Sequence, residues 1–173
     1  MLFYFTGTGN SLYVAKRLER QPISIPQVMH REDLTVSDDR IGIVAPIYGH
    51  EVPAMVQEFL EKATFQTPYF YMILTYGNRH GGAAELAQEL CARCINLVHM
   101  VDNWLPAFDM EEEQRKDKHV EEQLAAIQSD VAQQVAWIAP VTEADRAAHQ
   151  AFLAGMRLAP PDAWQHLLRV TQD

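Results

Sequence analysis

The chain has 173 residues, of which 48% are hydrophobic and 21% charged, a composition typical of one globular domain with a modest extension. Its formal net charge of −9 argues against nucleic acid and anionic membrane surfaces, because both are bound by clustered lysine and arginine. The start of the chain does not resemble a signal peptide, and no apolar run is long enough to cross a bilayer. Two cysteines cannot form a disulfide framework. We therefore expect a cytoplasmic protein.

Strand and helix patterns alternate over most of the chain. Short apolar runs predict strands at Leu2–Phe5, Ile23–Val28, Ile41–Ile47, Tyr69–Thr75 and Ile95–Val101. The second of these contains Pro26, which favours the edge of a sheet. Helices are expected between the strands, and the clearest has the apolar stripe Val52, Met55, Val56, Phe59, Leu60 and Ala63.

The C-terminal third is expected to be helical. The pattern predicts one long helix over Glu111–Ile138, with its sheet-facing residues at Val120, Leu124, Ile127, Val131, Val135 and Ile138. Thr142 is expected to cap a further helix that ends at Leu158, and a last short helix would carry Trp164, Leu167 and Leu168. We therefore expect a domain at residues 1–139 and a helical extension at residues 140–173, packed on or beside it.

Five strands that alternate with helices imply a parallel sheet covered on both faces, since parallel strands need crossover connections. Such sheets bind ligands beyond the carboxyl ends of their strands. The glycine-rich and aromatic loops of this chain all follow predicted strands.

The first of these loops is Thr6-Gly7-Thr8-Gly9-Asn10-Ser11, between a strand and a helix N-terminus. Glycines let the backbone close around an anion, hydroxyls donate hydrogen bonds, and the helix dipole favours negative charge. The loop has no lysine, so it is not a nucleoside-triphosphate loop, and it departs from Gly-x-Gly-x-x-Gly at Leu12. A single phosphate monoester suits it; a tight turn with a capping residue is the alternative.

Several motifs in order resemble one family. Phe3-Tyr4-Phe5-Thr6-Gly7-Thr8-Gly9-Asn10-Ser11 is similar to the FMN phosphate loop of flavodoxins, and Pro46-Ile47-Tyr48-Gly49-His50-Glu51-Val52-Pro53 and Thr75-Tyr76-Gly77 are similar to their two flavin-ring loops. With Asp102-Asn103-Trp104-Leu105-Pro106, they resemble the flavodoxin module of bacterial flavodoxin–ferredoxin fusion proteins, from Met1 to about Ile138. The resemblance implies an α/β, flavodoxin-like fold with a five-stranded parallel sheet in the order 2-1-3-4-5, helices on both faces and FMN as the cofactor.

By this resemblance, the cofactor-binding residues come from three loops. They are Thr6, Gly7, Thr8, Gly9, Asn10, Ser11, Pro46, Ile47, Tyr48, Gly49, His50, Thr75, Tyr76, Gly77, Asn78, Arg79, His80, Gly81 and Gly82. Tyr48 and Tyr76 are candidates to stack on the flavin, with ordinary packing at strand ends as the alternative. Arg79 and His80 would raise the flavin potential, because reduced flavin is an anion, unless both point to solvent. No catalytic side chain is expected, and the seven histidines show no metal-binding spacing.

The chain also departs from the fusion proteins. Their second module carries repeated Cys-x-x-Cys, whereas Cys91 and Cys94 are too few for an iron–sulfur cluster that takes four ligands. The redox partner is therefore expected to be another protein, such as a separate ferredoxin or a reductase. Cys91 and Cys94 are expected late in a helix, packed in the core, away from a strand-to-helix N-terminus where thiols become acidic.

Other users of this architecture fit less well. A receiver domain needs an aspartate where Ala45-Pro46 stands, and a low-molecular-weight phosphatase needs a cysteine and an arginine in the first loop. The sequence favours an FMN-binding electron-transfer protein and leaves open whether it is an enzyme. One alternative is an FMN-dependent NAD(P)H:acceptor reductase of the quinone type, in which the tail with Trp164 covers the pocket or forms a homodimer. The other is a non-catalytic adaptor with the same fold.

Overall fold

A computed structural model describes residues 1–89, 92–103 and 109–158 of the chain. Within these residues the strands are β1 (Leu2–Tyr4), β2 (Ile23–Ser24), β3 (Thr35–Ser37), β4 (Arg40–Pro46), β5 (Thr64–Gln66), β6 (Tyr69–Tyr76) and β7 (Cys94–His99). The helices are α1 (Asn10–Leu18), α2 (Ile25–Val28), α3 (Ala54–Lys62), α4 (Ala83–Gln88), α5 (Met110–Arg115), α6 (Val120–Ala132) and α7 (Glu143–Leu158).

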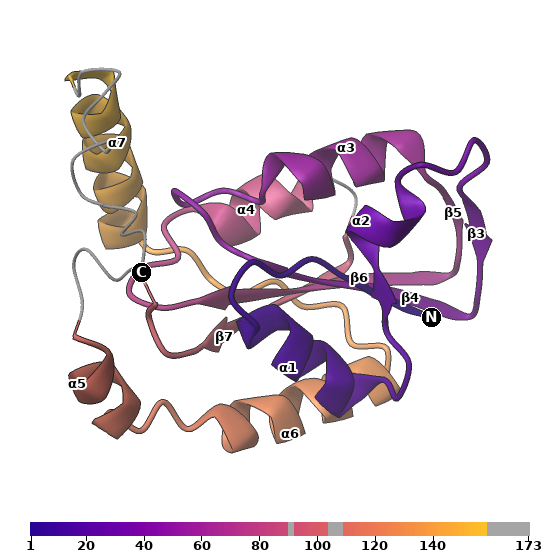
Figure 1. Cartoon of the computed structure of the whole chain (residues 1–173), viewed down its shortest axis with the longest axis horizontal. Helices are drawn as coiled ribbons and strands as arrows, with labels where there is room; N and C mark the ends of the chain where they lie inside the picture. Colours follow the sequence, from indigo (N-terminus) through magenta and orange to yellow (C-terminus); the bar gives the residue numbers. More distant parts are fainter. Residues whose placement is uncertain (90–91, 104–108, 159–173) are drawn as a thin grey trace, which may run out of the picture.

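The main sheet has five strands in the order β2-β1-β4-β6-β7, and every neighbouring pair is parallel. Counted within this sheet, the order is 2-1-3-4-5, which is the flavodoxin-like order. Helices α2, α3 and α4 lie on one face, and α1 and α6 lie on the other (Figure 1). The predicted fold class is therefore confirmed.

Two apolar layers hold the helices to the sheet. Because neighbouring residues of a strand point to opposite faces, Phe3 packs with α3, whereas Leu2 packs with α1 and α6. Val56 and Phe59 of α3 are fully buried, as their stripe predicts. Met55 was also expected in that stripe, but its side chain is 38% exposed, so the buried face of α3 is narrower than predicted.

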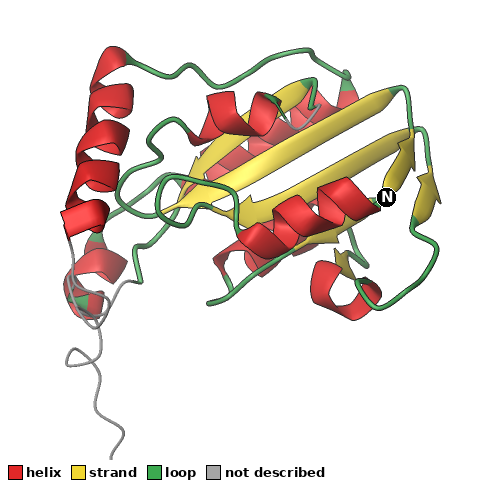
Figure 2. Ribbon diagram, turned by 90° about the horizontal axis from the view of Figure 1, so that it is seen from above, coloured by secondary structure: helices red, strands yellow, loops and turns green. Residues whose placement is uncertain are grey.

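Helix α7 stands across the ends of the strands rather than on either face of the sheet (Figures 1 and 2). Its start is a reciprocal cap: the Asp145 amide donates to Thr142 Oγ1 at 3.2 Å, and the Thr142 amide donates to Asp145 Oδ2 at 2.9 Å. The predicted cap at Thr142 is confirmed. None of the described side chains of α7 is fully buried.

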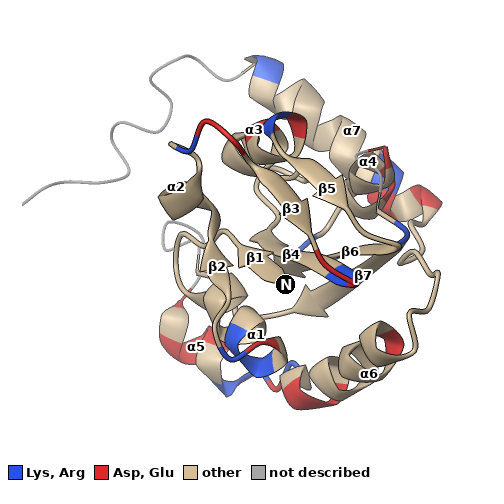
Figure 3. Cartoon of the chain, turned by 90° about the vertical axis from the view of Figure 1, so that its right-hand side faces the viewer, with Lys and Arg blue, Asp and Glu red and all other residues tan. Residues whose placement is uncertain are grey.

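Acidic residues cluster on α5 and α6 (Figure 3). The first turn of α5 holds Glu111, Glu112 and Glu113, where negative charge suits the helix dipole. Arg17 of α1 forms an ion pair with Glu121 of α6, on the face of the sheet that these two helices cover. Among the described residues, no helix is both long and apolar enough to span a membrane, and no group of acidic, cysteine and histidine side chains has the arrangement of a metal site.

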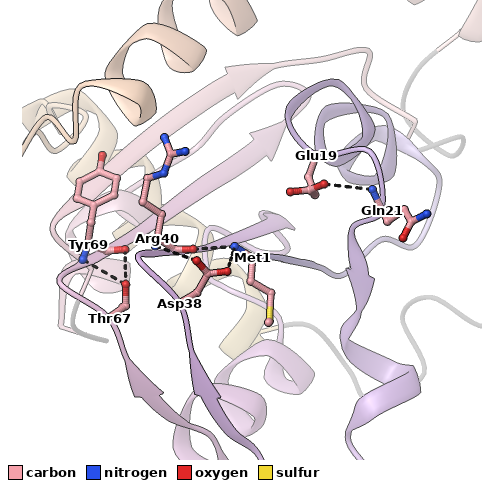
Figure 4. Close-up of polar contacts among 7 residues, drawn as sticks. All are labelled: Met1, Glu19, Gln21, Asp38, Arg40, Thr67 and Tyr69. Carbon is pink, nitrogen blue, oxygen red and sulfur yellow. Dashed lines mark hydrogen bonds and ion pairs between the residues drawn. The ribbon is translucent and has the colours of Figure 1, made fainter.

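Polar contacts fix the amino-terminal edge of the sheet (Figure 4). The Met1 ammonium donates to Asp38 Oδ2 at 2.7 Å and to the Arg40 carbonyl at 2.8 Å, which joins the starts of β1 and β4. Thr67 Oγ1 accepts from the Tyr69 amide at 3.3 Å where β6 begins. The loops that follow β1, β4 and β6 lie at the opposite, carboxyl edge of the sheet.

The second predicted strand is shorter than expected. It ends at Ser24 and continues directly into α2, with Pro26 in the first helical turn. Proline is well tolerated there, because the amide that it lacks has no partner within a helix. The prediction also missed a two-stranded parallel sheet of β3 and β5, whose three-residue strands are too short to show a period.

The predicted helix over residues 111–138 is wrong as one element. Helix α5 ends at Arg115, His119 adopts a left-handed conformation with φ 50°, and α6 then runs only to Ala132. Leu124, Ile127 and Val131 do face the sheet. Ile138 instead forms a parallel bridge with Ile95, because the chain turns back along the free edge of β7.

Cys94 was expected late in a helix, which is also wrong: it is the first residue of β7. Its predicted burial is confirmed, since its side chain is fully enclosed. Cys91, the Trp104-Leu105-Pro106 part of the fourth motif, and the expected last helix lie outside the described residues.

Candidate functional site

A cavity of about 710 Å³ lies at the carboxyl edge of the main sheet. Its walls come from the loops after β1, β4, β6 and β7 and from α7. They are lined by Thr6, Gly7, Thr8, Asn10, Ser11, Pro46, Ile47, Tyr48, Gly49, His50, Thr75, Tyr76, Gly77, Asn78, Arg79, Val101, Asp102, Asn103, Phe152 and Met156. The volume lies within the range of about 300–1,000 Å³ found for small-molecule sites.

The first loop leads into α1 through Gly9, which adopts φ 104° as the residue before the helix. The Gly9 amide donates to Thr6 Oγ1 at 3.0 Å, so the loop is closed on itself. The first amides of a helix have no partner within the helix, and the first turn of α1 carries no acidic residue. This end of the cavity therefore favours an anion.

Three side chains of the first loop join it to its neighbours. Ser11 Oγ and Thr75 Oγ1 form a buried hydrogen bond of 2.8 Å, and Asn10 Nδ2 donates to the Val101 carbonyl at 2.9 Å. Thr8 is hydrogen-bonded to Asn103 in the loop after β7. The side chains of Asn10 and Ser11 thus connect the loops, and an anion at this end is left chiefly with backbone amides and the Thr6 and Thr8 hydroxyls.

The second loop is a tight turn that carries an aromatic ring. The backbones of Tyr48 and Glu51 exchange two hydrogen bonds of 3.0 and 3.1 Å, and the residues between them, Gly49 and His50, have φ of 58° and 71°. Positive φ at both central residues is the geometry of a type I′ turn. The side chain of Tyr48 reaches back to the first loop. A Cβ built on Gly7 would lie only 2.3 Å from the Tyr48 hydroxyl oxygen.

The third loop presents one tyrosine and one cation. Tyr76 stacks on His99 with ring centroids 4.9 Å apart, and its edge meets His80 at 5.1 Å. Burial, followed by the nearby carboxylate of Asp145, raises the pKa of Tyr76. Among the described lining residues, Arg79 contributes the one full positive charge and Asp102 the one full negative charge.

Helix α7 closes the cavity through Phe152 and Met156. The Phe152 ring packs on His50 at 4.9 Å, and His149 lies 5.6 Å from the same imidazole. Two ion pairs fix the helix: Asp145 lies 3.6 Å from His80, and Arg146 lies 2.5 Å from Glu85 of α4. The helix lies in the extension predicted at residues 140–173, and it forms part of the cavity wall.

The crowding around His50 affects its protonation. Burial lowers the pKa of His50, and the neighbouring His149, Arg79 and His80 lower it further. Its Nδ1 atom is buried without a hydrogen-bond partner within the described part of the chain. The neutral imidazole is therefore favoured where α7 meets the second loop.

Most of the predicted site residues line this one cavity, and four do not: Gly9, His80, Gly81 and Gly82. Gly9 and Gly82 precede α1 and α4, His80 turns to Asp145, and Gly81 packs against His50. The predicted set lacked five lining residues: Val101, Asp102 and Asn103 after β7, and Phe152 and Met156 of α7. The i, i+4 spacing of Phe152 and Met156 in the helix after Thr142 was the available signal for the last two, whereas Trp164, the residue expected to cover the pocket, lies outside the described residues.

The strand order, with a cavity where the order reverses, defines a flavodoxin-like α/β protein. No protein-family model matches the chain, and no curated protein matches it in sequence. Among solved structures, the Trp repressor binding protein from Bacillus subtilis is similar to 75% of this chain, over 95% of its own length, with 11% sequence identity and a TM-score of 0.43.

Proposed function

We propose that the protein binds FMN in this cavity and serves as an electron-transfer flavoprotein. The observation that carries the proposal is that one cavity is bounded at one end by a glycine and hydroxyl loop at a helix N-terminus and along its walls by aromatic loops. A phosphorylated, flat ligand matches both ends. The resemblance of the loops to those of flavodoxins supports the same ligand.

The donor set fits FMN. A monoester phosphate needs several hydrogen-bond donors, and the amides at the start of α1 with the Thr6 and Thr8 hydroxyls supply them without lysine. Gly7 has no side chain, and a Cβ there would meet the Tyr48 hydroxyl, so the loop and the tyrosine approach as closely as they do only because this residue is glycine. The remaining walls are mostly apolar, as a flavin ring requires.

The residues divide the work of binding. The first loop holds the phosphate, while Ile47, Tyr48 and Tyr76 border the ring with the backbones of the second and third loops. Arg79 places a positive charge on the cavity and favours a negatively charged occupant. When bound, FMN supplies the electron-transfer chemistry, and the protein supplies position and electrostatics.

The partners follow from charge and from the resemblance. A net charge of −9, with acidic residues on α5 and α6, favours encounter with a basic face of another redox protein, such as a separate ferredoxin or a reductase (Figure 3). We place this exchange in the cytoplasm. A homodimer formed through residues 140–173 stays a prediction.

One observation favours a second candidate function. Phe152 and Met156 of α7 cover part of the cavity, and a covered ring suits a small acceptor better than a docking protein. The second candidate is therefore an FMN-dependent NAD(P)H:acceptor reductase of the quinone type. It would oxidise NAD(P)H rapidly when a quinone is present, whereas a carrier would turn over slowly.

An FMN titration tests the proposal. Flavin absorbance and fluorescence of the purified protein are followed as FMN is added, with riboflavin, which lacks the phosphate, as the matched control ligand. We expect saturable FMN binding, tighter than that of riboflavin, and slow NAD(P)H oxidation. No uptake at high FMN concentration would refute FMN binding and favour the adaptor, and rapid quinone-dependent turnover would favour the reductase.

A further inference from the structure

A network of charged and polar side chains lies behind the third loop, outside the cavity itself. It consists of Glu113 of α5, Lys118 in the segment between α5 and α6, and His99 at the end of β7. The Glu113 side chain is 4% exposed and that of Lys118 is 12% exposed, which is unusual for charged residues and marks them as paired. Their Oε2 and Nζ atoms lie 3.6 Å apart, and Glu113 also pairs with Lys116.

His99 connects this network to the cavity. Its Nε2 atom lies 2.7 Å from the Gly77 carbonyl oxygen, and its ring stacks on Tyr76 with only 4° between the planes. Gly77 and Tyr76 both line the cavity. His99 itself is held by Gln123, whose Oε1 accepts from the His99 amide at 2.9 Å.

The two partners of His99 Nε2 make incompatible demands on it. The Gly77 carbonyl accepts hydrogen bonds only, so it requires a proton on Nε2, whereas the Lys118 ammonium, 3.0 Å from the same atom, donates only and would require a lone pair. The shorter contact is that to the carbonyl, which favours a proton on Nε2, with Lys118 acting on the ring as a nearby positive charge paired with Glu113.

We propose that His99 is a positioning residue of the cavity: as a neutral imidazole protonated on Nε2, it fixes the Gly77 carbonyl and the Tyr76 ring, and its burial together with the Lys118 ammonium, which Glu113 holds in place, keeps it neutral. Lys118 lies in the interruption between α5 and α6, from which it contacts both Glu113 and His99. The consequence for FMN depends on the proposed function; the state of His99 does not.

The electrostatics agree with this geometry. Burial lowers the pKa of His99, and Lys118 lowers it further, while the Gly77 hydrogen bond, Glu113 and Asp102 act in the opposite direction. Hydrogen bonding from Lys116, followed by the charge of Lys118, lowers the pKa of Glu113, so its carboxylate stays ionised. The charged groups that face His99 are thus Lys118, Glu113 and Asp102.

Nuclear magnetic resonance of the flavin-free, full-length protein tests which tautomer His99 adopts and whether Lys118 affects its protonation. Long-range proton–nitrogen spectra distinguish a proton on Nε2 from one on Nδ1, and a pH titration gives the midpoint of His99. We expect the Nε2-protonated neutral form at pH 7.5 and, in Lys118→Met, a midpoint about one pH unit higher. A proton on Nδ1, or an unchanged midpoint in Lys118→Met, would overturn the proposal.

A pair of variants tests the effect on the cavity. His99→Phe keeps an aromatic ring beside Tyr76 but loses the donor, whereas His99→Gln keeps a donor. We expect His99→Phe to weaken FMN binding by about two- to tenfold, the effect of one hydrogen bond, and His99→Gln to restore most of the affinity. Equal loss in both variants would contradict a role for the donor. If wild-type protein takes up no FMN, the proposed function fails while the spectroscopic test of His99 stands.

Discussion

Gly7 matters because of what faces it. A Cβ built on residue 7 would lie 2.3 Å from the hydroxyl oxygen of Tyr48. That hydroxyl is the end of a flexible side chain, which is 48% exposed. Gly7→Ala should therefore displace Tyr48 without unfolding the protein. We expect a loss of FMN affinity of roughly tenfold with stability changed by less than about 0.5 kcal/mol.

The matched control for that change is the double variant Gly7→Ala with Tyr48→Phe. Removing the hydroxyl relieves the contact, since the next ring atom, Cζ, would lie at 3.5 Å. FMN titration of the double variant should recover most of the affinity. Continued weak binding would show that the alanine acts on the loop backbone rather than on the tyrosine.

Gly77 is in a different position, because a Cβ there would lie 2.6 Å from the Cα of Asp102, which cannot move aside as a side-chain end can. Gly77→Ala should destabilise the fold by about 1–3 kcal/mol, measured by urea unfolding. Gly155→Ala is the control: no described atom lies within 4 Å of its Cβ, and alanine favours a helix. Gly155→Ala should leave stability unchanged or raise it, and a matching loss would contradict the steric explanation.

Arg79 supplies the positive charge among the described lining residues, and that charge favours the anionic reduced flavin. Arg79→Ala is expected to lower the FMN midpoint potential in a redox titration. Arg20→Ala, an exposed arginine outside the cavity lining, is the control and should not change the potential. An unchanged or higher potential in Arg79→Ala would refute the assignment.

At this scale, the sequence identified residues by their place after a strand. That was enough for Tyr48, Gly77 and Arg79, which all line the cavity. It was not enough to show that Ser11 bonds to Thr75, or that His99 supports Gly77, because those contacts join residues far apart in the chain. A motif specifies residue types, whereas hydrogen-bond partners depend on how the loops meet.

At the scale of elements, the errors have local physical causes. An apolar period continues from Val120 through Ile138, but Gln134 adopts φ 52° and ends the helical turn, so the last part of the period belongs to an extended segment. Before Val120, His119 adopts φ 50° and separates α5 from α6, a backbone conformation that a hydrophobic period does not report. The cap at Thr142, in contrast, depends only on residues three apart and was predictable.

The docking of α7 should depend on pH. His50, on which α7 packs, has a lowered pKa, so docking favours its neutral form and is fully present above the ordinary value of 6.5. As the pH falls, a protonated His50 faces His149, Arg79 and His80. We expect hydrogen-exchange protection of α7 amides, corrected for intrinsic rates, to fall at least about threefold between pH 7.5 and 5.5.

One ion pair opposes that trend, because a protonated His80 attracts Asp145 at 3.6 Å. The pair is partly exposed and is worth less than about 1 kcal/mol, so we expect the repulsion around His50 to prevail. Asp145→Asn should steepen the loss of protection, and His149→Phe should reduce it. Protection that increases toward pH 5.5 in the wild type would refute the role of His50.

At the scale of the whole molecule, the alternation of strands and helices was sufficient to predict a parallel sheet covered on both faces and the edge that carries the cavity, whereas the order of the strands was implied by the resemblance to flavodoxins. The helical extension predicted at residues 140–173 begins with α7, which lines the cavity through Phe152 and Met156. A connection rich in proline and threonine indicates only where one element ends, and packing decides whether the next element belongs to the same unit.

If α7 is part of the cavity, FMN should stabilise it together with the sheet. Free FMN at a hundredfold excess over its Kd should raise the free energy of unfolding by about 2.7 kcal/mol, and the protection of α7 amides should rise along with that of β4 and β6.

Phe152→Ala with Met156→Ala should weaken FMN binding, while the stability of flavin-free protein changes by less than about 1 kcal/mol because both side chains are partly exposed.

Leu158→Ala provides the matched control on the same helix, since Leu158 is 86% exposed and does not line the cavity. It should leave both FMN affinity and stability unchanged. Equal weakening by Leu158→Ala would mean that the substitutions act on the helix in general. FMN binding that protects β4 and β6 but not α7 would show that α7 lies beside the ligand without closing on it.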